Sequence, residues 1–273
     1  STLYLVPTPI GNLQEMTPRA LEILNSVDVI ACEDTRTSGQ LLKHFDIHKR
    51  LIAYQNFNEE SSCKGIVKLL SEGLNVALIS DAGYPLINDP GQKVVTLATQ
   101  EGYNVVPVSG CSAFLNALVA SGLVAQPFLF IGFLPSSSSE CKKKVQMYKD
   151  YPMTMVFYEA PHRIEKTLRI LLEVFGNRRC TLARELTKLH EEFLRGTIEE
   201  ILEVVNELKG EMVIVVEGNT MDPQEAVTEE VLLQKVEEYI EKGMKASMAV
   251  KEVSKETGVS KNRIYELVHR TKE

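Results

Sequence analysis

The sequence lacks the usual signatures of disulfide scaffolds and of membrane or exported proteins. Its five cysteines are odd in number and widely spread, and no two have the C-x-x-C spacing of a zinc or redox site. No apolar run approaches the ~18 residues of a membrane span, and the first residues lack the basic segment and cleavage site of a signal peptide. We therefore expect a protein of the reducing cytoplasm, with no disulfide framework and no membrane segment.

Short motifs for nucleotide and metal sites are missing as well. The segment TPIGNL at residues 8–13 is not G-x-G-x-x-G, and no G-K-[ST] follows it, so neither a Rossmann nor a Walker loop is indicated. The segment HEE at residues 190–192 is not H-E-x-x-H, which argues against a zinc hydrolase. Gly11 still allows close backbone approach at this turn, although a simple tight turn explains the local sequence equally well.

Charge is distributed unevenly along the chain. The formal net charge is -7, which argues against a surface that grips nucleic acid throughout. Residues 242–273 nevertheless hold eight Lys or Arg against four Glu. Residues 248–257 and 261–269 flank a short turn and have helix-turn-helix character, with Ser260 as the cap of the last helix and Lys261 and Arg263 at its exposed beginning. This tail suggests nucleic-acid contact, or else a dimerisation or capping unit.

Apolar strands alternate with amphipathic helices over most of the chain, which predicts an α/β fold with a mostly parallel first sheet. The first set of predicted strands covers residues 3–6, 27–31, 51–54, 76–80 and 105–108, and the second covers 128–132, 154–158, 181–183, 192–195 and 212–217. We expect an N-terminal α/β domain at 1–117, a second α/β domain at 118–220, and a small helical tail at 221–273 after a linker at 219–226. The polar residues 135–140 fit a lid or surface loop, and Lys142 to Lys144 fit a solvated helix face or an RNA contact.

The most informative segment is SDAGYPLINDPG at residues 80–91, which follows a buried apolar strand. Gly and Pro at this density specify a tightly folded loop. In an open α/β sheet, ligands bind beyond the carboxyl ends of the strands. The segment therefore predicts two carboxylates, Asp81 and Asp89, at a ligand crevice.

Other predicted strands also end in charged or small residues. EDTR at 33–36 has two interpretations: Arg36 grips a phosphate while an acid orients a ligand, or Asp34 caps the next helix and pairs with Arg36. SGCSA at 109–113 offers small residues against which a flat ligand can lie. In the second set of strands the corresponding segments are FYEAPHR at 157–163, ARELTK at 183–188 and the GE pair at 210–211.

Together, TPIGNL, EDTR, SDAG-P-I-DPG, FYEAPHR, ARELTK and GE resemble, in order and spacing, the ribosomal RNA small-subunit cytidine 2′-O-methyltransferases of the tetrapyrrole methylase-like (class III) superfamily. The resemblance covers essentially the whole chain. It implies two α/β domains with S-adenosylmethionine in the cleft between them, a homodimer, and no metal. It also implies a ribose hydroxyl of a decoding-region cytidine in 16S ribosomal RNA, within the small subunit, as acceptor.

By motif match, the resemblance places the methyl donor against Gly11, Asp81, Ala82, Gly83, Ser112, Ala113, Tyr158, Ala183, Arg184, Gly210 and Glu211. The chain departs from the family pattern at two points of this pocket. Tyr84 stands where the family usually has threonine, and Ser109-Gly-Cys111 replaces a Pro-Gly-Pro turn.

A ribose hydroxyl is a poor nucleophile, so a nearby base would assist its attack on the donor. The candidates for this catalytic role are Glu33, Asp34, Glu185 and Lys188, although a lysine could serve only with a lowered pKa. The candidates for substrate binding are Arg36, His162, Arg163, Lys261 and Arg263. Two alternatives stay open at this stage: a tetrapyrrole methyltransferase of the same fold, and a ligand-sensing regulator whose tail binds DNA.

Overall fold

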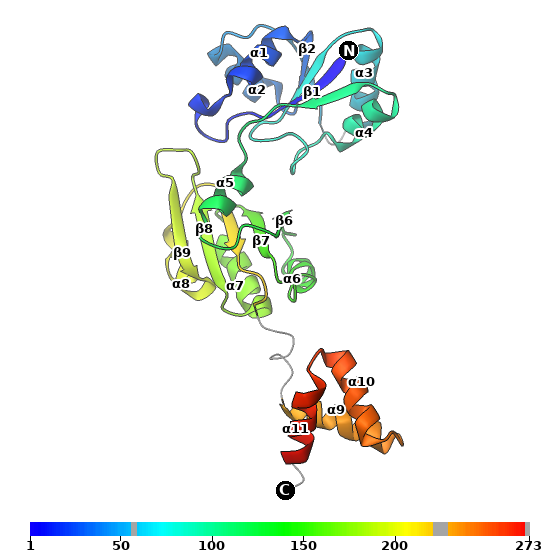
Figure 1. The fold of residues 1–273 in the computed structure, drawn as a ribbon. Coiled ribbons are helices and arrows are strands. Elements are labelled where there is room, and N and C mark those ends of the chain that lie inside the picture. Colours follow the sequence, from blue (N-terminus) through cyan, green and yellow to red (C-terminus); the bar gives the residue numbers. More distant parts are fainter. Residues whose placement is uncertain (56–58, 221–228, 271–273) are drawn as a thin grey trace. The chain divides into compact units, whose positions relative to one another are not determined.

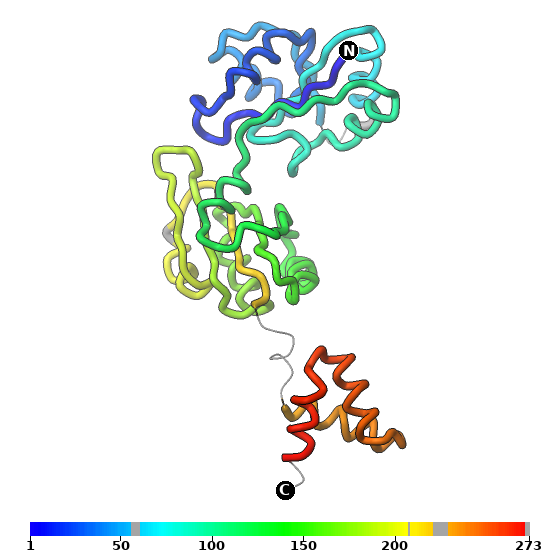
Figure 2. Tube along the Cα trace, viewed as in Figure 1, coloured from blue at the N-terminus to red at the C-terminus, as the bar shows by residue number. Residues whose placement is uncertain are grey.

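A computed structural model describes residues 1–55, 59–220 and 229–270 of the chain. These residues form two compact units, Ser1–Gly218 and Asn219–Glu273, and the path of the chain through each can be followed in Figures 1 and 2. Residues 221–226 of the predicted linker lie outside the described residues. None of the helices in the described part of the chain is long and apolar enough to cross a membrane.

The first sheet of the larger unit has five strands in the order β3-β2-β4-β1-β5, and every pair in it is parallel, as predicted. The strands are β1 Thr2–Val6, β2 Val29–Cys32, β3 Arg50–Ala53, β4 Val76–Ile79 and β5 Asn104–Pro107. The elements between them are η1 Leu13–Glu15, α1 Pro18–Ser26, α2 Thr35–His44, α3 Glu59–Ser71 and α4 Gln92–Gln100. Because the strands are parallel, all five carboxyl ends lie at one edge of the sheet.

Helices cover both faces of this sheet (Figure 1). Along β4, Val76 and Leu78 pack with side chains of α3 and α4, whereas Ala77 and Ile79 pack with side chains of α1 and α2. Successive strand residues point to opposite faces, so a strand buried on both sides reads as an unbroken apolar run. This is why the strands were recognisable from the sequence.

The second sheet is mixed and has the order β6-β7-β10-β8-β9. Its strands are β6 Phe128–Phe133, β7 Thr154–Glu159, β8 Arg179–Arg184, β9 Glu192–Thr197 and β10 Met212–Val216. Only β6 and β7 pair in parallel, since β10 runs antiparallel to both β7 and β8, and β9 is antiparallel to β8. Each of the first two predicted domains, 1–117 and 118–220, contains one of the two sheets, and their boundaries stay a prediction.

Helix α5 (Ala113–Ala120) follows the last strand of the first sheet and packs on one face of the second. The other face is covered by a large apolar core shared with α6 Ser138–Gln146, α7 Ile164–Phe175, α8 Ile198–Val204 and η3 Val205–Glu207. The prediction of a loop over 135–140 was partly wrong, because α6 begins at Ser138. This start buries Cys141 and Val145 in the core, while Lys142 stays at the surface and pairs with Glu173.

The smaller unit consists of α9 Glu229–Glu241, α10 Ala246–Thr257 and α11 Lys261–Arg270, packed around their own apolar core. Gly258 ends α10 in the left-handed conformation, with φ of 72°. Ser260 accepts a hydrogen bond from the amide of Arg263 at 3.4 Å, which confirms its predicted capping role. Lys261 and Arg263 are exposed at the start of α11.

Candidate functional site

The loops after β1 and β4 are joined at the carboxyl edge of the first sheet. The backbones of Thr8 and Gly83 exchange two hydrogen bonds, of 3.0 and 2.9 Å. Both Thr8 and Ser80 are buried, with Thr8 Oγ1 donating to the Ser80 carbonyl at 3.0 Å and Ser80 Oγ to the Gly83 carbonyl at 2.6 Å. These bonds fix the Asp81-Ala82-Gly83 turn in place.

The loop continues from residue 84 to 91 in a tightly constrained conformation. Leu86 and Asn88 have φ of 74° and 64°, values that side-chain-bearing residues seldom adopt. Gly91 has φ of 143°, and a Cβ atom there would lie 2.8 Å from Cδ1 of Leu86. The Tyr84 hydroxyl accepts a hydrogen bond from the Gly110 amide at 3.0 Å, which ties the loop to the end of β5. The predicted compact loop is therefore present.

Three segments of the second sheet meet at one edge because of the strand directions. Met212 at the start of β10 lies opposite Glu159 at the end of β7 and opposite Arg184 at the end of β8. The antiparallel central strand thus brings its own beginning to the place where its neighbours end. This register brings together the YEA, ARE and GE segments, which are far apart in the sequence.

An ion-pair group joins the loops of this second edge. Lys188 Nζ lies 3.1 Å from Glu185 Oε1 and 3.0 Å from Glu211 Oε2. The Glu211 amide donates to Glu185 Oε1 at 3.2 Å, and the Glu185 carboxylate occupies the space where a Cβ atom of Gly210 would be. The absence of a side chain at Gly210 is therefore a condition for this group.

The two edges contact each other within the larger unit. A Cβ atom on Gly11 would lie 2.5 Å from Cγ of Lys188, so the glycine lets the second edge approach the first. The amide side chain of Asn88 likewise occupies the space that a Cβ atom of Gly132 in β6 would need.

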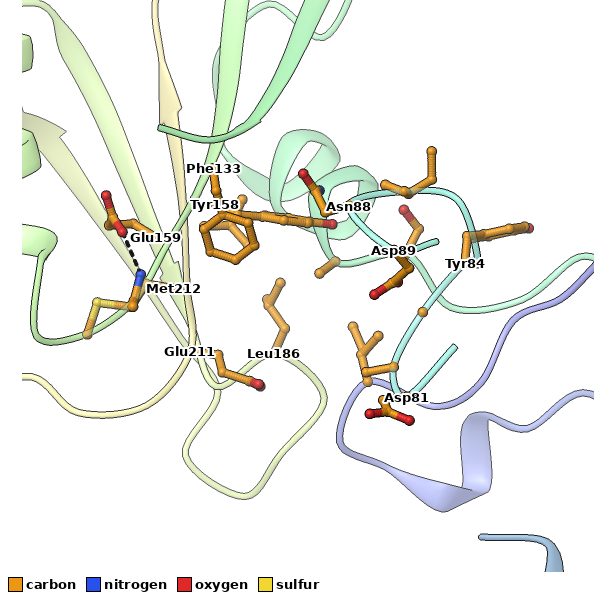
Figure 3. A pocket seen from close by; sticks show the side chains of 18 of the residues that line it. Asp81, Tyr84, Asn88, Asp89, Phe133, Tyr158, Glu159, Leu186, Glu211 and Met212 are labelled. Carbon is orange, nitrogen blue, oxygen red and sulfur yellow. Dashed lines mark hydrogen bonds between the residues drawn. The ribbon is translucent and has the colours of Figure 1, made fainter. Parts of the chain in front are cut away.

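A cavity of about 440 Å³ lies between these edges (Figure 3). In this view Asp81, Tyr84 and Asp89 lie on one side, and Tyr158, Leu186 and Glu211 lie on the other. Its size is that of a small-molecule site. The complete lining is Ile10, Asp81, Ala82, Gly83, Tyr84, Ile87, Asn88, Asp89, Ser112, Ala113, Phe133, Tyr158, Glu159, Ala160, Pro161, Leu186, Glu211, Met212 and Val213.

Carboxylates raise one another's pKa on the first-sheet side. Burial, with the charges of Glu33 and Asp81, raises the pKa of Asp89 to about 6. Burial and the charges of Asp81 and Asp34 raise the pKa of Glu33. Burial likewise raises the pKa of Asp81, outweighing the hydrogen bond from the Asp34 amide, and the charge of Asp34 adds to it. This side of the cavity is negative at neutral pH and suits a cationic ligand.

On the second-sheet side of the cavity, the pKa shifts keep the groups in their usual charge states. A hydrogen bond from Lys188 lowers the pKa of Glu185. Partial burial acts to lower the pKa of Lys188, but hydrogen bonds to Glu211 and Glu185 outweigh it, so this pKa is raised. Burial raises the pKa of Tyr158 to about 12, against the Phe114 amide that donates to its hydroxyl at 3.2 Å and with the help of the Asp89 charge. These groups keep their ordinary protonation states at pH 7.

The structure brings most of the residues predicted for the donor to this cavity. Those that line it are Asp81, Ala82, Gly83, Ser112, Ala113, Tyr158 and Glu211. The other four lie beside it: Gly11 contacts Lys188, Ala183 is buried, Arg184 donates to Glu192 at 2.6 Å, and Gly210 lies against Glu185. Their role toward a donor stays a prediction.

None of the four predicted catalytic residues lines the cavity. Glu33 acts on it through the charge that it exerts on Asp89. Asp34 caps α2, accepting from the Arg36 amide at 2.8 Å, with Arg36 Nε at 3.5 Å. The capping interpretation of EDTR is therefore correct. Glu185 and Lys188 are paired with each other, and the raised pKa of Lys188 leaves it a cation and not a base.

The residues predicted to bind substrate are dispersed. Arg36 and His162 are exposed, and Lys261 and Arg263 belong to the smaller unit. Arg163 has internal partners, because its Nε lies 3.2 Å from Glu159 Oε1 and its Nη2 donates to the Leu134 carbonyl at 2.8 Å. Contact between any of these residues and a substrate stays a prediction.

The candidate list from the sequence omitted several residues of the lining. Asp89 was expected at the crevice without being assigned a role. Asn88 and Leu186 lie within two of the segments recognised in the sequence, residues 80–91 and 183–188, but were assigned no role. Phe133 was not anticipated, since nothing in its local sequence separates it from an ordinary strand residue. No group of three or more His, Cys, Asp or Glu side chains within the described ranges is arranged to hold a metal ion.

Comparison with protein families and curated proteins gives consistent matches. Residues 2–202 match the family model of the tetrapyrrole (corrin/porphyrin) methylases. The chain is 45% identical to "Ribosomal RNA small subunit methyltransferase I" of Halalkalibacterium halodurans, over 98% of this chain and 94% of the relative. The proteins of the same name from Bacillus subtilis and Synechocystis are 45% and 40% identical, over 98% and 97% of this chain and 94% and 96% of theirs.

Solved structures share the fold at lower identity. A uroporphyrin-III-C-methyltransferase from Thermus thermophilus superposes with a TM-score of 0.56 at 20% identity, covering 79% of this chain and 94% of that one. A diphthine synthase superposes with a TM-score of 0.60 at 14% identity, over 81% and 92% of the two chains. At this identity the similarity is one of fold alone.

Proposed function

The chain belongs to the tetrapyrrole methylase family, among the proteins named ribosomal RNA small subunit methyltransferase I, and from this premise we propose how it acts. It is a methyltransferase that uses S-adenosylmethionine to methylate the ribose 2′-oxygen of a decoding-region cytidine in 16S ribosomal RNA. The observation that carries the proposal is the full-length identity of 45% to relatives with that name, together with a cavity at the family's motifs.

The cavity fits this donor in size and in charge. When bound, S-adenosylmethionine supplies a methyl group on a positively charged sulfonium. Asp81 offers negative charge to such a cation, while Ile10, Leu186 and Val213 offer apolar contact. Ser112 and Ala113 at the start of α5 and the Asp81-Ala82-Gly83 turn provide the small residues that a flat ligand needs.

An RNA acceptor is supported by the smaller unit. Its last helix begins with exposed Lys261 and Arg263, and the tail carries an excess of positive charge in an acidic chain. Such charges bind phosphates in any sequence and make affinity depend on salt. If the unit contributes, the double variant Lys261→Ala, Arg263→Ala reduces the salt dependence of subunit binding; an unchanged salt dependence would remove these residues from the interface.

We further propose a homodimer in the cytoplasm, where ribosomal subunits are made. Leu115 and Val119, one turn apart on α5, are 45% and 68% exposed, and Val124 and Phe128, which follow α5 in the chain, are 67% and 38% exposed. An apolar face of this kind commonly marks an interface. Light scattering on the purified chain should give twice the mass of one chain, and the mass of a single chain at micromolar concentration would contradict the proposal.

The experiment that tests the function is methyl transfer from tritium-labelled S-adenosylmethionine to small subunits from a strain that lacks this gene. Nuclease mapping should place the label on one cytidine, at the ribose 2′-oxygen. Subunits from the parent strain, already methylated, serve as the control and should accept no label. Donor binding without transfer would show that the acceptor is wrong, and the absence of donor binding at millimolar concentration would overturn the function itself.

A further inference from the structure

One carboxylate of the cavity has none of the partners that occupy its neighbours. Asp89 lines the cavity and is half-buried, and it makes neither a hydrogen bond nor an ion pair with any residue that the structure describes. A partly buried carboxylate without a partner costs free energy in the folded state, and perturbed groups of this kind cluster at functional sites. Its surroundings therefore point to function and not to folding.

The other groups of the cavity that could accept a proton already have hydrogen-bond or ion-pair partners. The Glu159 carboxylate is buried and accepts from the Ala160 amide at 2.8 Å and from Thr167 Oγ1 at 2.5 Å. Glu211 pairs with Lys188, and the Tyr158 hydroxyl accepts from the Phe114 amide. Asp81 is exposed and interacts with the Asp34 amide. Among the cavity-lining residues, and counting partners only within the described part of the chain, Asp89 alone combines partial burial with an unoccupied carboxylate.

The backbone holds Asp89 firmly. The preceding residue, Asn88, has φ of 64° and its amide side chain contacts Gly132 of the second sheet. The following Pro90 is buried, and Gly91 lies against Leu86. Residues held in sparsely populated conformations at both ends of a short segment are typical of a preorganised site.

Charge tunes this carboxylate for proton transfer. The groups that face it are Glu33 after β2, Asp81 after β4 and the Tyr158 hydroxyl of β7. Two negative neighbours and partial burial bring its pKa to about 6. A base with a pKa just below the working pH is ionised and still has appreciable proton affinity, which is the favourable range for general-base catalysis.

We propose that Asp89 is the general base that removes the proton from the acceptor hydroxyl, a role that rests on the proposed methyltransferase function. The acceptor O–H bond breaks and its proton passes to the Asp89 carboxylate. The acceptor oxygen forms a bond to the methyl carbon as the bond from that carbon to the sulfonium sulfur breaks, leaving the electron pair on a neutral thioether. Charge is conserved. Before the step the sulfonium carries one positive charge and the carboxylate one negative charge, and after it the thioether and the protonated Asp89 are both neutral.

The main variant is Asp89→Asn, which keeps the size of the side chain and removes the base. Single-turnover transfer to unmethylated subunits, at saturating donor and acceptor, should be slower by about 100-fold or more. Asp46→Asn is the matched control, because Asp46 is exposed and its one ion pair among the described residues is with His48. Its rate should equal that of the unaltered protein.

The pH profile distinguishes a base from a residue that only shapes the cavity. The unaltered protein should show a kcat/KM, which reports the free protein, that rises with unit slope up to about pH 6 and then levels off. Asp89→Asn should lose this rise. Glu33→Gln should move it to lower pH, because one of the charges that raises the Asp89 pKa is gone.

Donor binding, measured by calorimetry without RNA, gives a readout separate from activity. Asp89→Asn should bind S-adenosylmethionine within about tenfold of the unaltered protein, since Asp81 still provides negative charge. A variant that binds donor weakly but reacts at full rate when saturated would make Asp89 a donor-binding residue and overturn the proposal. A variant with the full rate and the same pH profile would overturn it too. If the unaltered protein binds donor but methylates no subunit, the proposed function fails first, and the two failures are thereby distinguished.

Discussion

The two edges that enclose the cavity use charge in opposite ways. At the edge of the first sheet, Glu33, Asp81 and Asp89 form no ion pair among the described residues, and their pKa values are raised. At the edge of the second sheet, Glu185, Glu211 and Glu159 are each paired with a cation. A carboxylate paired with a cation holds its loop in place. An unpaired carboxylate retains its affinity for protons, and its negative charge can act on a ligand. The paired edge is therefore the one held by its own contacts, and the unpaired edge is the one to which our proposal assigns the chemistry.

The largest expected loss of stability comes from breaking the ion pair of the second-sheet edge that involves the buried Glu159. Glu159→Ala leaves Arg163, which is 22% exposed, without its carboxylate partner and removes the acceptor of Thr167. Removal of one partner from a buried pair is strongly destabilising, and we expect a loss of about 3 kcal/mol in the free energy of unfolding. Urea denaturation measures it.

Glu165→Ala is the matched control for this variant. Glu165 also pairs with an arginine four residues later, Arg169, but both side chains are well exposed, at 40% and 65%. An exposed pair of this kind contributes about 0.5 kcal/mol or less. Equal losses in the two variants would show that the pair at the cavity is no more structural than an ordinary surface pair.

A second variant tests whether the ion-pair group of the second edge depends on Gly210. Gly210→Ala places a Cβ atom where the Glu185 carboxylate lies, in a backbone with φ of 90°. We expect a loss of about 2 kcal/mol, of which the left-handed backbone accounts for about 1 kcal/mol. Gly73→Ala has a similar φ of 88° and no atom within 4 Å, so it isolates the backbone contribution. If both variants lose the same free energy, the contact with Glu185 has no structural weight.

At the first-sheet edge, where the carboxylates are unpaired, we expect removal of a charge to raise the free energy of unfolding instead of lowering it. Asp89 has a pKa of about 6 in the folded state against 3.8 as its ordinary value, so the folded state binds more protons between these pH values. Its charge therefore lowers stability as pH rises through this window. A difference of about two pKa units corresponds to about 3 kcal/mol, which exposure of the half-buried carboxylate reduces to about 1 kcal/mol.

Asp89→Asn should accordingly be more stable than the unaltered protein by about 1 kcal/mol at pH 7.5 and equally stable near pH 4. Thermal denaturation at both pH values measures this, with Asp46→Asn as the surface control. A variant that is less stable at pH 7.5 would show that Asp89 has a structural partner, and the contrast between the two edges would then be lost.

The smallest expected change in stability concerns the hydrogen bond between Tyr84 and Gly110, which joins the loop after β4 to the end of β5. Tyr84→Phe removes the hydroxyl that accepts from the Gly110 amide, which should lower stability by about 1 kcal/mol or less. Tyr151→Phe, at a 42% exposed position, should leave stability unaltered. Chemical denaturation of both variants measures this. If Tyr84→Phe leaves the free energy of unfolding unchanged, other contacts maintain the conformation of the loop.

Local chemistry was sufficient for much of this protein. Apolar runs such as that of β4 predicted the parallel strands, because a strand buried on both faces leaves no polar position in the sequence. Ser260 was recognisable as a helix cap from the residues beside it, and the structure confirms it. The density of Gly and Pro after β4 marked the loop of the cavity in the same way, since backbone conformation depends on near neighbours.

The tertiary structure alone decided which charged residues line the cavity and how their pKa values shift. Glu33 and Asp89 both belong to carboxylate-rich loops in the sequence, but only Asp89 lines the cavity. Its pKa depends on groups that stand 8 and 56 positions earlier in the chain. Lys188 was a candidate base until the antiparallel course of β10 brought Glu211 to it and raised its pKa. The strength of a charge depends on burial and on distances through space, and those are set by strand order and direction, which no local pattern encodes.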